Sequence, residues 1–162
     1  MANSSIISKA KNKIIKEFIK DENIVNAINS STVDKPQDLI YSHIFDYNQN
    51  PHTIENVETF ITVEVSIPET FYWEQTFVKP IVEIWITSHE KHMRVDNIPK
   101  IKQNRNDYLS ELIDQKLNGK DGYGIGKLKL KSNVAGAYQM DYLWRKMVFE
   151  GTDLNNSLCE DE

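Results

Sequence analysis

Cysteine is almost absent from this chain of 162 residues: the only one, Cys159, lies in the acidic C-terminal stretch. A single thiol cannot form an internal disulfide, so we expect the protein to be made in the reducing cytoplasm. Long hydrophobic runs are also missing, and no apolar stretch approaches the ~20 residues that a membrane-spanning helix needs. Residues 1–5 do not begin the compact apolar segment of a signal peptide, so we expect no export.

An excess of basic residues is missing too. The chain has 19 Lys and Arg against 24 Asp and Glu, a formal net charge of -5, which argues against a general DNA-binding surface. Hydrophobic residues (40%) and charged residues (27%) are near globular values, so the composition suggests neither a disordered nor a fibrous chain. We therefore expect a single domain over residues 1–153, followed by an acidic flexible tail over 154–162.

The first part of the chain has helical periodicity. Apolar residues recur at steps of three and four from Ile7 to Phe18, which predicts an N-terminal helix over residues 4–29, continuous and kinked or in two pieces. Residues 38–47 fit either a helical turn or an extended segment, and we favour an irregular connection.

The middle of the chain alternates between apolar and polar residues. The alternation predicts one strand from Val57 to Val65 and a second over 77–87, interrupted near Pro80. The connection over 68–76 is predicted to be a long hairpin tip. Three neighbouring aromatic residues mark it as a candidate interface with a partner: Phe71, Tyr72 and Trp73.

A second helix and two further strands are predicted beyond this hairpin. Apolar residues mark the helix from Ile98 to Leu117, and Gly119 suits a left-handed C-cap. The order of helix, two strands, helix and two strands lacks the alternation of parallel βαβ units. It predicts an α+β fold with an antiparallel sheet and helices packed on one face, the sheet and second helix spanning residues 55–150.

A catalytic or metal site is not apparent. In His89-Glu90-Lys91-His92 the second histidine comes one residue too early for the His-Glu-x-x-His zinc helix, which favours a polar loop. The glycines at 122, 124 and 126 follow a helix and precede a strand, the reverse of a phosphate-binding loop. Four carboxylates are expected to be scattered over the solvent side of the strands: Glu58, Glu64, Glu69 and Glu83. We predict no catalytic residue, metal ligand or cofactor.

A basic strand is the other notable surface feature. Alternation places the side chains of Lys127, Lys129 and Lys131 on one face and those of Leu128 and Leu130 toward the core. An exposed strand whose charges deter edge pairing explains the pattern. The alternative is a basic face toward nucleic acid or an acidic partner, which a symmetric ring would multiply into a belt.

The chain resembles the tail-terminator and tail-completion (neck) proteins of tailed bacteriophages over residues 55–153. The resemblance lies in the helix sequence over 104–113, the Gly-rich turn, the alternating strand and the closing strand that ends at 148–153. It implies a compact α+β subunit, six copies of which close into a ring at the head-proximal end of the tail tube.

The resemblance also implies partners and a location. A virion protein made in the host cytoplasm would contact tail tube and neck or head-completion proteins through the aromatic tip and the N-terminal helix. DNA would pass through the lumen without sequence-specific binding, and the lysine strand is a candidate lining. A head-tail adaptor or head-closure protein is a neighbouring alternative.

Two hypotheses of other classes stay open. A small metal-dependent hydrolase or nuclease would use His89, Glu90 and His92 with distant carboxylates. An intracellular binding module would recognise a protein partner through the aromatic tip.

Overall fold

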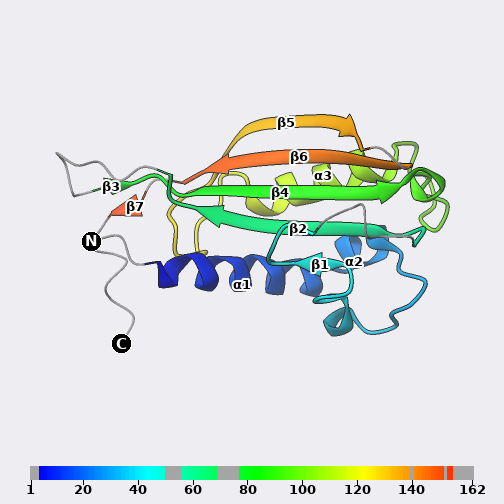
Figure 1. The fold of residues 1–162 in the computed structure, drawn as a ribbon, viewed down its shortest axis with the longest axis horizontal. Helices are drawn as coiled ribbons and strands as arrows, with labels where there is room; N and C mark the ends of the chain where they lie inside the picture. The colour runs from blue at the N-terminus through cyan, green and yellow to red at the C-terminus, as the bar shows by residue number, and fades with distance from the viewer. Residues whose placement is uncertain (1–3, 50–55, 69–76, 139–140, 152, 155–162) are drawn as a thin grey trace.

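The computed structural model describes residues 4–49, 56–68, 77–138, 141–151 and 153–154 (Figure 1). Its elements follow the predicted order, with short additions. They are α1 (Ser5–Lys20), α2 (Glu22–Ile28), the 3-10 turn η1 (Pro36–Leu39), β1 (Ile44–Phe45), β2 (Thr59–Ser66), β3 (Phe77–Val78), β4 (Ile81–His89), the 3-10 turn η3 (Glu90–His92), α3 (Arg105–Leu117), β5 (Lys129–Ala137), β6 (Tyr142–Glu150) and β7 (Asp153–Leu154).

The sheet confirms the predicted α+β class. Five of the described strands form one sheet in the order β1-β2-β4-β6-β5, antiparallel except for the short parallel pair β1-β2. The helices pack on one face, where alternate residues of β4 (Val82, Ile84 and Ile86) join a core with Phe18 of α1 and Leu109 of α3. In Figure 1 the strands pass in front of α3.

The N-terminal helical region is two helices. Asp21 has an extended backbone that ends α1, and its carboxylate accepts hydrogen bonds from the backbone N–H groups of Asn23 and Ile24 at 3.0 and 3.4 Å. An aspartate at this position satisfies donors that the first turn of a helix leaves free. Lys116 of α3 binds the other carboxylate oxygen at 2.8 Å, so this break also joins α3 to the N-terminal helices.

Two boundaries differ from the expectation. The helix α3 begins at Arg105, because the side chain of Asn104 caps the N–H of Asp107 at 2.9 Å; the residues from Ile98 to Asn104 form a loop. Residues 38–47 contain both a helical turn and the short strand β1, where we favoured an irregular connection.

The interruption at Pro80 is confirmed, and it redirects the chain. The segment before it, β3, leaves the main sheet and pairs with β7 in a separate two-stranded sheet. The expected aromatic tip (Phe71, Tyr72 and Trp73) and residues 155–162 of the expected tail lie outside the described residues. Within the described part of the chain, no helix has the length and apolar character to cross a membrane.

Candidate functional site

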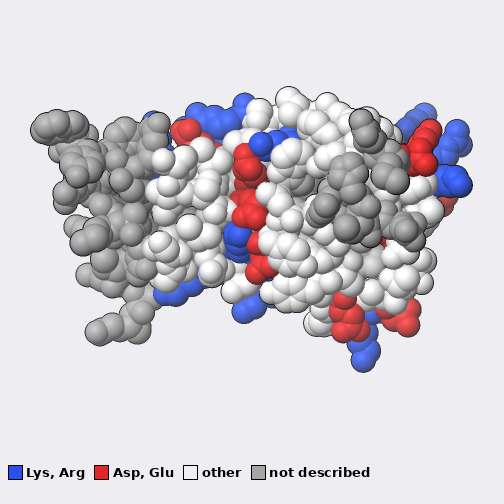
Figure 2. All heavy atoms as spheres, viewed as in Figure 1, with Lys and Arg blue, Asp and Glu red and all other residues white. Residues whose placement is uncertain are grey.

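The face of the sheet opposite α3 is the main candidate for a functional surface. The strands pass in front of α3 in Figure 1, and Figure 2 is viewed from the same side, so it shows this face. Most of its described surface carries no charge, and one narrow band of acidic and basic residues crosses it (Figure 2). We call this face of the sheet, opposite α3, the open face.

An aromatic row lies on the open face across β4 and β6. The ring centroids of Trp85 and Trp144 are 5.2 Å apart, and that of Tyr138 lies 6.2 Å from Trp144. Gly136 of β5 makes room for this arrangement, since a Cβ atom there would lie 2.3 Å from Cζ2 of Trp144. The Trp144 ring therefore lies directly over the backbone of the edge strand, and all three rings are only partly buried.

The charged band contains two carboxylates that meet across the sheet. Glu64 of β2 and Glu83 of β4 are direct cross-strand partners, an arrangement that is destabilising when both charges are uncompensated. Each has its own lysine: Lys11 of α1 lies 2.6 Å from Glu64, and Lys146 of β6 lies 2.7 Å from Glu83. The expectation of scattered carboxylates was wrong here, but these two are engaged in ion pairs.

Lys146 also connects the charged band to the aromatic row. Its Nζ atom lies 4.9 Å from the ring centroid of Trp85, within the range of a cation–π contact. The lysine is thus held by both Glu83 and Trp85, which fixes a cation between the aromatic and acidic parts of the open face. Flat, partly exposed aromatic surface with fixed charges is typical of protein–protein interfaces.

The predicted basic strand is present, with a change in its geometry. Lys127, Lys129 and Lys131 are exposed and Leu128 is buried, as expected. A β-bulge lies between Leu130 and Ser132, so strict alternation ends at Lys131. Glu150 of β6 is the cross-strand partner of Lys129 and lies 3.4 Å from Lys131, and it partly offsets the basic charge.

The residues of the hydrolase hypothesis are held by different partners. His89 accepts a hydrogen bond from the backbone N–H of Lys91 at 3.1 Å and lies edge-on to Tyr142, whereas Glu90 is exposed. His92 turns inward to Thr59, with Nδ1 2.7 Å from Oγ1. Across the described residues, no group of three or more His, Cys, Asp or Glu side chains could hold a metal ion.

A buried polar chain at this end of the sheet was not predicted. It runs from His92 through Thr59 to Ser88, and the hydroxyl oxygens of Thr59 and Ser88 are 2.8 Å apart. Ser88 in turn donates a hydrogen bond to Oδ1 of Asn106 at 2.6 Å. Nδ2 of Asn106 in turn donates to the carbonyl of Leu143 at 3.1 Å. These hydrogen bonds join β2, β4, β6 and the first turn of α3, so we assign the buried polar side chains a structural role.

Glu58, expected to face solvent, is also buried in this region. Its carboxylate accepts hydrogen bonds from the backbone N–H and the hydroxyl of Ser31 and lies 3.2 Å from Nε2 of His43. Burial by itself raises the pKa of Glu58, but the bonds from Ser31 and His43 outweigh it and lower that pKa below its usual value. A hydrogen-bonded carboxylate with this preference for the charged form is a poor general acid.

Stability should fall on mild acidification because of His92. Burial, and then the Arg105 cation, lower the pKa of His92, although Glu58 acts in the opposite direction. The unfolded chain therefore takes up a proton near pH 6.5 that the folded chain binds only at lower pH, so folding weakens as pH falls below this value. We expect denaturant titrations between pH 7 and 5 to show a slope below the single-proton limit of about 1.4 kcal/mol per pH unit.

The His92→Gln variant should remove most of this slope. His89→Gln is the matched control, because His89 lies on the same segment and outside the buried polar chain, and it should keep the slope. An unchanged slope in His92→Gln would contradict the assignment. Glu58 also contributes to the free energy of unfolding, but this contribution is lost at lower pH. The loss occurs as pH falls from the usual carboxyl pKa through the lowered pKa of Glu58 in the folded protein.

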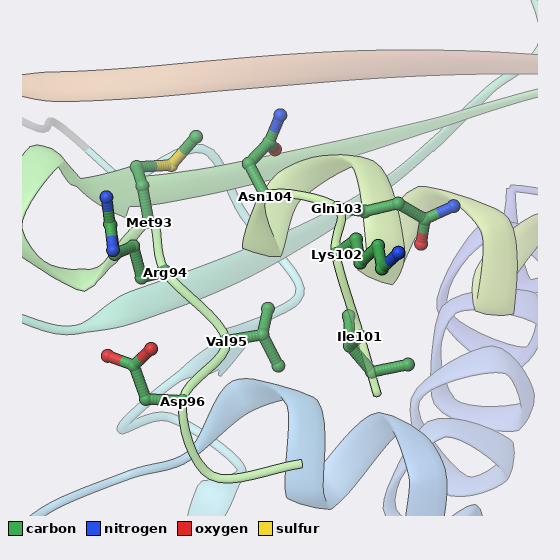
Figure 3. A pocket seen from close by; sticks show the side chains of 8 residues that line it. All are labelled: Met93, Arg94, Val95, Asp96, Ile101, Lys102, Gln103 and Asn104. Carbon is green, nitrogen blue, oxygen red and sulfur yellow. The ribbon is translucent and has the colours of Figure 1, made fainter. Parts of the chain in front are cut away.

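The loop before α3 borders an open cavity of about 460 Å³ (Figure 3). Its two legs are joined by a bridge between Arg94 and Asn104. Val95 and Ile101 lie between the legs, whereas the charged side chains of Arg94, Asp96 and Lys102 point in different directions (Figure 3). Because its polar groups do not converge, the cavity is not arranged to hold a small ligand.

The fold and surfaces together define a small α+β protein whose distinctive exposed features are an open sheet face and an exposed edge strand. The family model described as YomW matches residues 12–150, and the chain belongs to this family. The YomW family carries a bacteriophage name, so the protein is phage-related.

A curated protein also shows partial similarity. Sesquiterpene synthase 2 of Thapsia garganica is 30% identical over 115 residues, which cover 71% of this chain. The chain spans about a fifth of the length of that relative, 20%. No synthase activity follows from a match of this extent.

Proposed function

We propose that this protein is a structural subunit of the phage neck or tail terminus. It forms a homo-oligomeric ring that caps the tail tube and joins it to the head. The expected number of subunits in this ring is six. The observation that carries the proposal is the one-sided cover of the sheet: helices bury one face, and the aromatic row of Trp85, Trp144 and Tyr138 remains on the other. Membership of a phage-named family supports it.

The open face has the chemistry that subunit seams use. Tryptophan and tyrosine bury large areas at little cost in side-chain entropy, and they dominate the binding energy of many interfaces. The ion pairs Lys11–Glu64 and Lys146–Glu83 would fix the register between subunits without opposing like charges. Tail tube and neck or head-completion proteins would be the further partners, with no cofactor.

The lysine strand has a role within the same proposal. In a ring, the exposed residues Lys127, Lys129 and Lys131 of every copy would form a belt that lines the lumen through which DNA passes. Such a belt attracts phosphates without reading base sequence. The aromatic tip at Phe71, Tyr72 and Trp73 stays a proposed contact with the tube or a neighbouring subunit, and the virion is the proposed location.

Assembly can be tested with Trp144→Ala. We expect the full chain to form rings on the ends of tail tubes in negative-stain images, and the variant to lose this binding. Truncation of a central interface tryptophan costs about 2 kcal/mol or more, a loss of roughly 30-fold in affinity.

The matched control is Tyr41→Ala, which removes an aromatic side chain that is 62% exposed on the turn before β1. It should assemble like the parent. Circular dichroism of all three proteins separates loss of assembly from loss of folding. A parent protein that stays monomeric at high concentration and ignores tail tubes would count against the proposed function.

A further inference from the structure

The edge strand β5 has a row of backbone groups without partners in the described structure. Tyr138 donates its N–H to the carbonyl of Tyr142 at 2.8 Å, which fixes the phase of the β5–β6 ladder. Because hydrogen-bonding direction alternates along an antiparallel strand, Asn133, Ala135 and Ala137 direct their N–H and C=O groups away from β6. In the described part of the chain, β5 pairs with β6 alone, and no residue outside the strands forms a backbone hydrogen bond with these three.

The side chains of this segment leave the edge accessible. Residues 132–137 are Ser, Asn, Val, Ala, Gly and Ala, with no charge and no proline, and Val134 is 50% exposed. Natural edge strands are usually blocked by lysines, bulges or prolines. Here Lys129, Lys131 and the bulge protect only the first part of β5, and the rest lies along the upper border of the sheet in Figure 1.

We propose that a second copy of this chain pairs with β5 through its own β5, antiparallel and related by a two-fold axis near Val134. This register places Asn133 opposite Ala135 and Lys131 opposite Ala137. No like charges face each other along the seam, and the small side chains allow the two backbones to approach to the normal distance between strands, ~4.8 Å.

The charges at the two ends of β5 favour the second copy as the occupant. Lys129 and Lys131 lie at its start and Lys127 just before it, whereas Asp141 lies in the turn that follows it. Glu90 is next to that turn, since its N–H binds the carbonyl of Asp141 at 2.7 Å. Antiparallel pairing brings the basic end of each copy to the acidic end of the other, twice per dimer.

This pairing goes beyond the proposed ring and does not depend on it. A two-fold contact uses the same patch on both partners, whereas a cyclic ring needs two different patches, so β5 pairing describes the free protein in solution. It would also keep an uncharged edge away from uncontrolled strand addition before assembly. A protein can therefore fail this test and still form rings, or dimerise and ignore tail tubes.

The proposal can be tested by light scattering of the full chain over a range of concentrations. We expect dimers for the parent, and for Ala135→Pro a dimer Kd raised about 30-fold or more, because one outward N–H is lost from each copy, about 1 kcal/mol for each bond. The β5–β6 ladder does not use this N–H, and the control Ala135→Ser, which keeps it, should remain dimeric.

A second variant keeps the test decisive if proline disturbs the strand. Val134→Lys adds an ammonium group at an exposed position near the two-fold axis, so the two copies repel each other and the dimer should weaken at low salt and recover at high salt. Val134→Thr is its neutral control. The proposal would be overturned if the parent is monomeric over the whole concentration range. It would also be overturned if both Ala135→Pro and Val134→Lys dimerise like the parent.

Discussion

Replacing Arg105 with methionine is expected to lower the free energy of unfolding by about 3 kcal/mol. Arg105 is 1% exposed, and its guanidinium donates to three backbone carbonyls: Nε to His92 at 2.6 Å, Nη2 to Arg94 at 2.6 Å, and Nη1 to Ala27. Methionine fills a similar space but leaves these carbonyls without their donors. Each buried acceptor left unpaired costs about 1–3 kcal/mol, which relief of the buried charge offsets in part.

The measurement is urea unfolding followed by circular dichroism at pH 7. Arg94→Met is the matched control, because the Arg94 side chain is exposed and only its carbonyl takes part in the contact, so its stability should change by less than about 0.5 kcal/mol. Equal stability of the two variants would show that the bonds of Arg105 do not hold the end of α2 and the loop before α3 together.

Much of the fold could be predicted from periodicity. Alternation in β4 places Val82, Ile84 and Ile86 on one face, and that is the face the helices cover. The same pattern contained the signal for the open face: Trp85 lies between Ile84 and Ile86, so it had to point the other way. The prediction missed its role because the sequence does not say that Trp144, 59 residues later along the chain, lies beside it.

The buried polar groups could not be predicted for a related reason. Arg105 follows a helix cap and reads as an ordinary exposed residue of a first turn, and its three carbonyl acceptors come from segments that only the tertiary structure brings together. Glu58 and His92 likewise lie beside apolar strands at positions where solvent is the default expectation. The bulge after Leu130 has no glycine or proline to mark it, so Lys131 was assigned by alternation alone.

Gly151 should be the least replaceable glycine in the described part of the chain. It directly follows β6, its N–H binds the carbonyl of Pro80 at 2.9 Å, and it is buried. A Cβ atom there would lie 2.3 Å from the carbonyl oxygen of Ile125, a backbone atom that cannot rotate away. Gly151→Ala must therefore shift either the end of β6 or the glycine-rich turn that carries Ile125. We expect a loss of about 2–3 kcal/mol in the free energy of unfolding, the cost of overpacking a buried site.

Gly119→Ala separates this steric effect from the general cost of replacing glycine. A Cβ atom at Gly119 meets nothing within 4 Å, but its φ of +74° makes alanine strained by about 1 kcal/mol. Thermal and urea unfolding should then rank the parent first, Gly119→Ala second and Gly151→Ala last. The reverse order of the two variants would mean that the turn yields easily at Ile125. In that case the close backbone contact at Gly151 does not hold the junction of β6 with the turn. The side chains of Ile125 and Leu128, which are fully buried in the core, hold it instead.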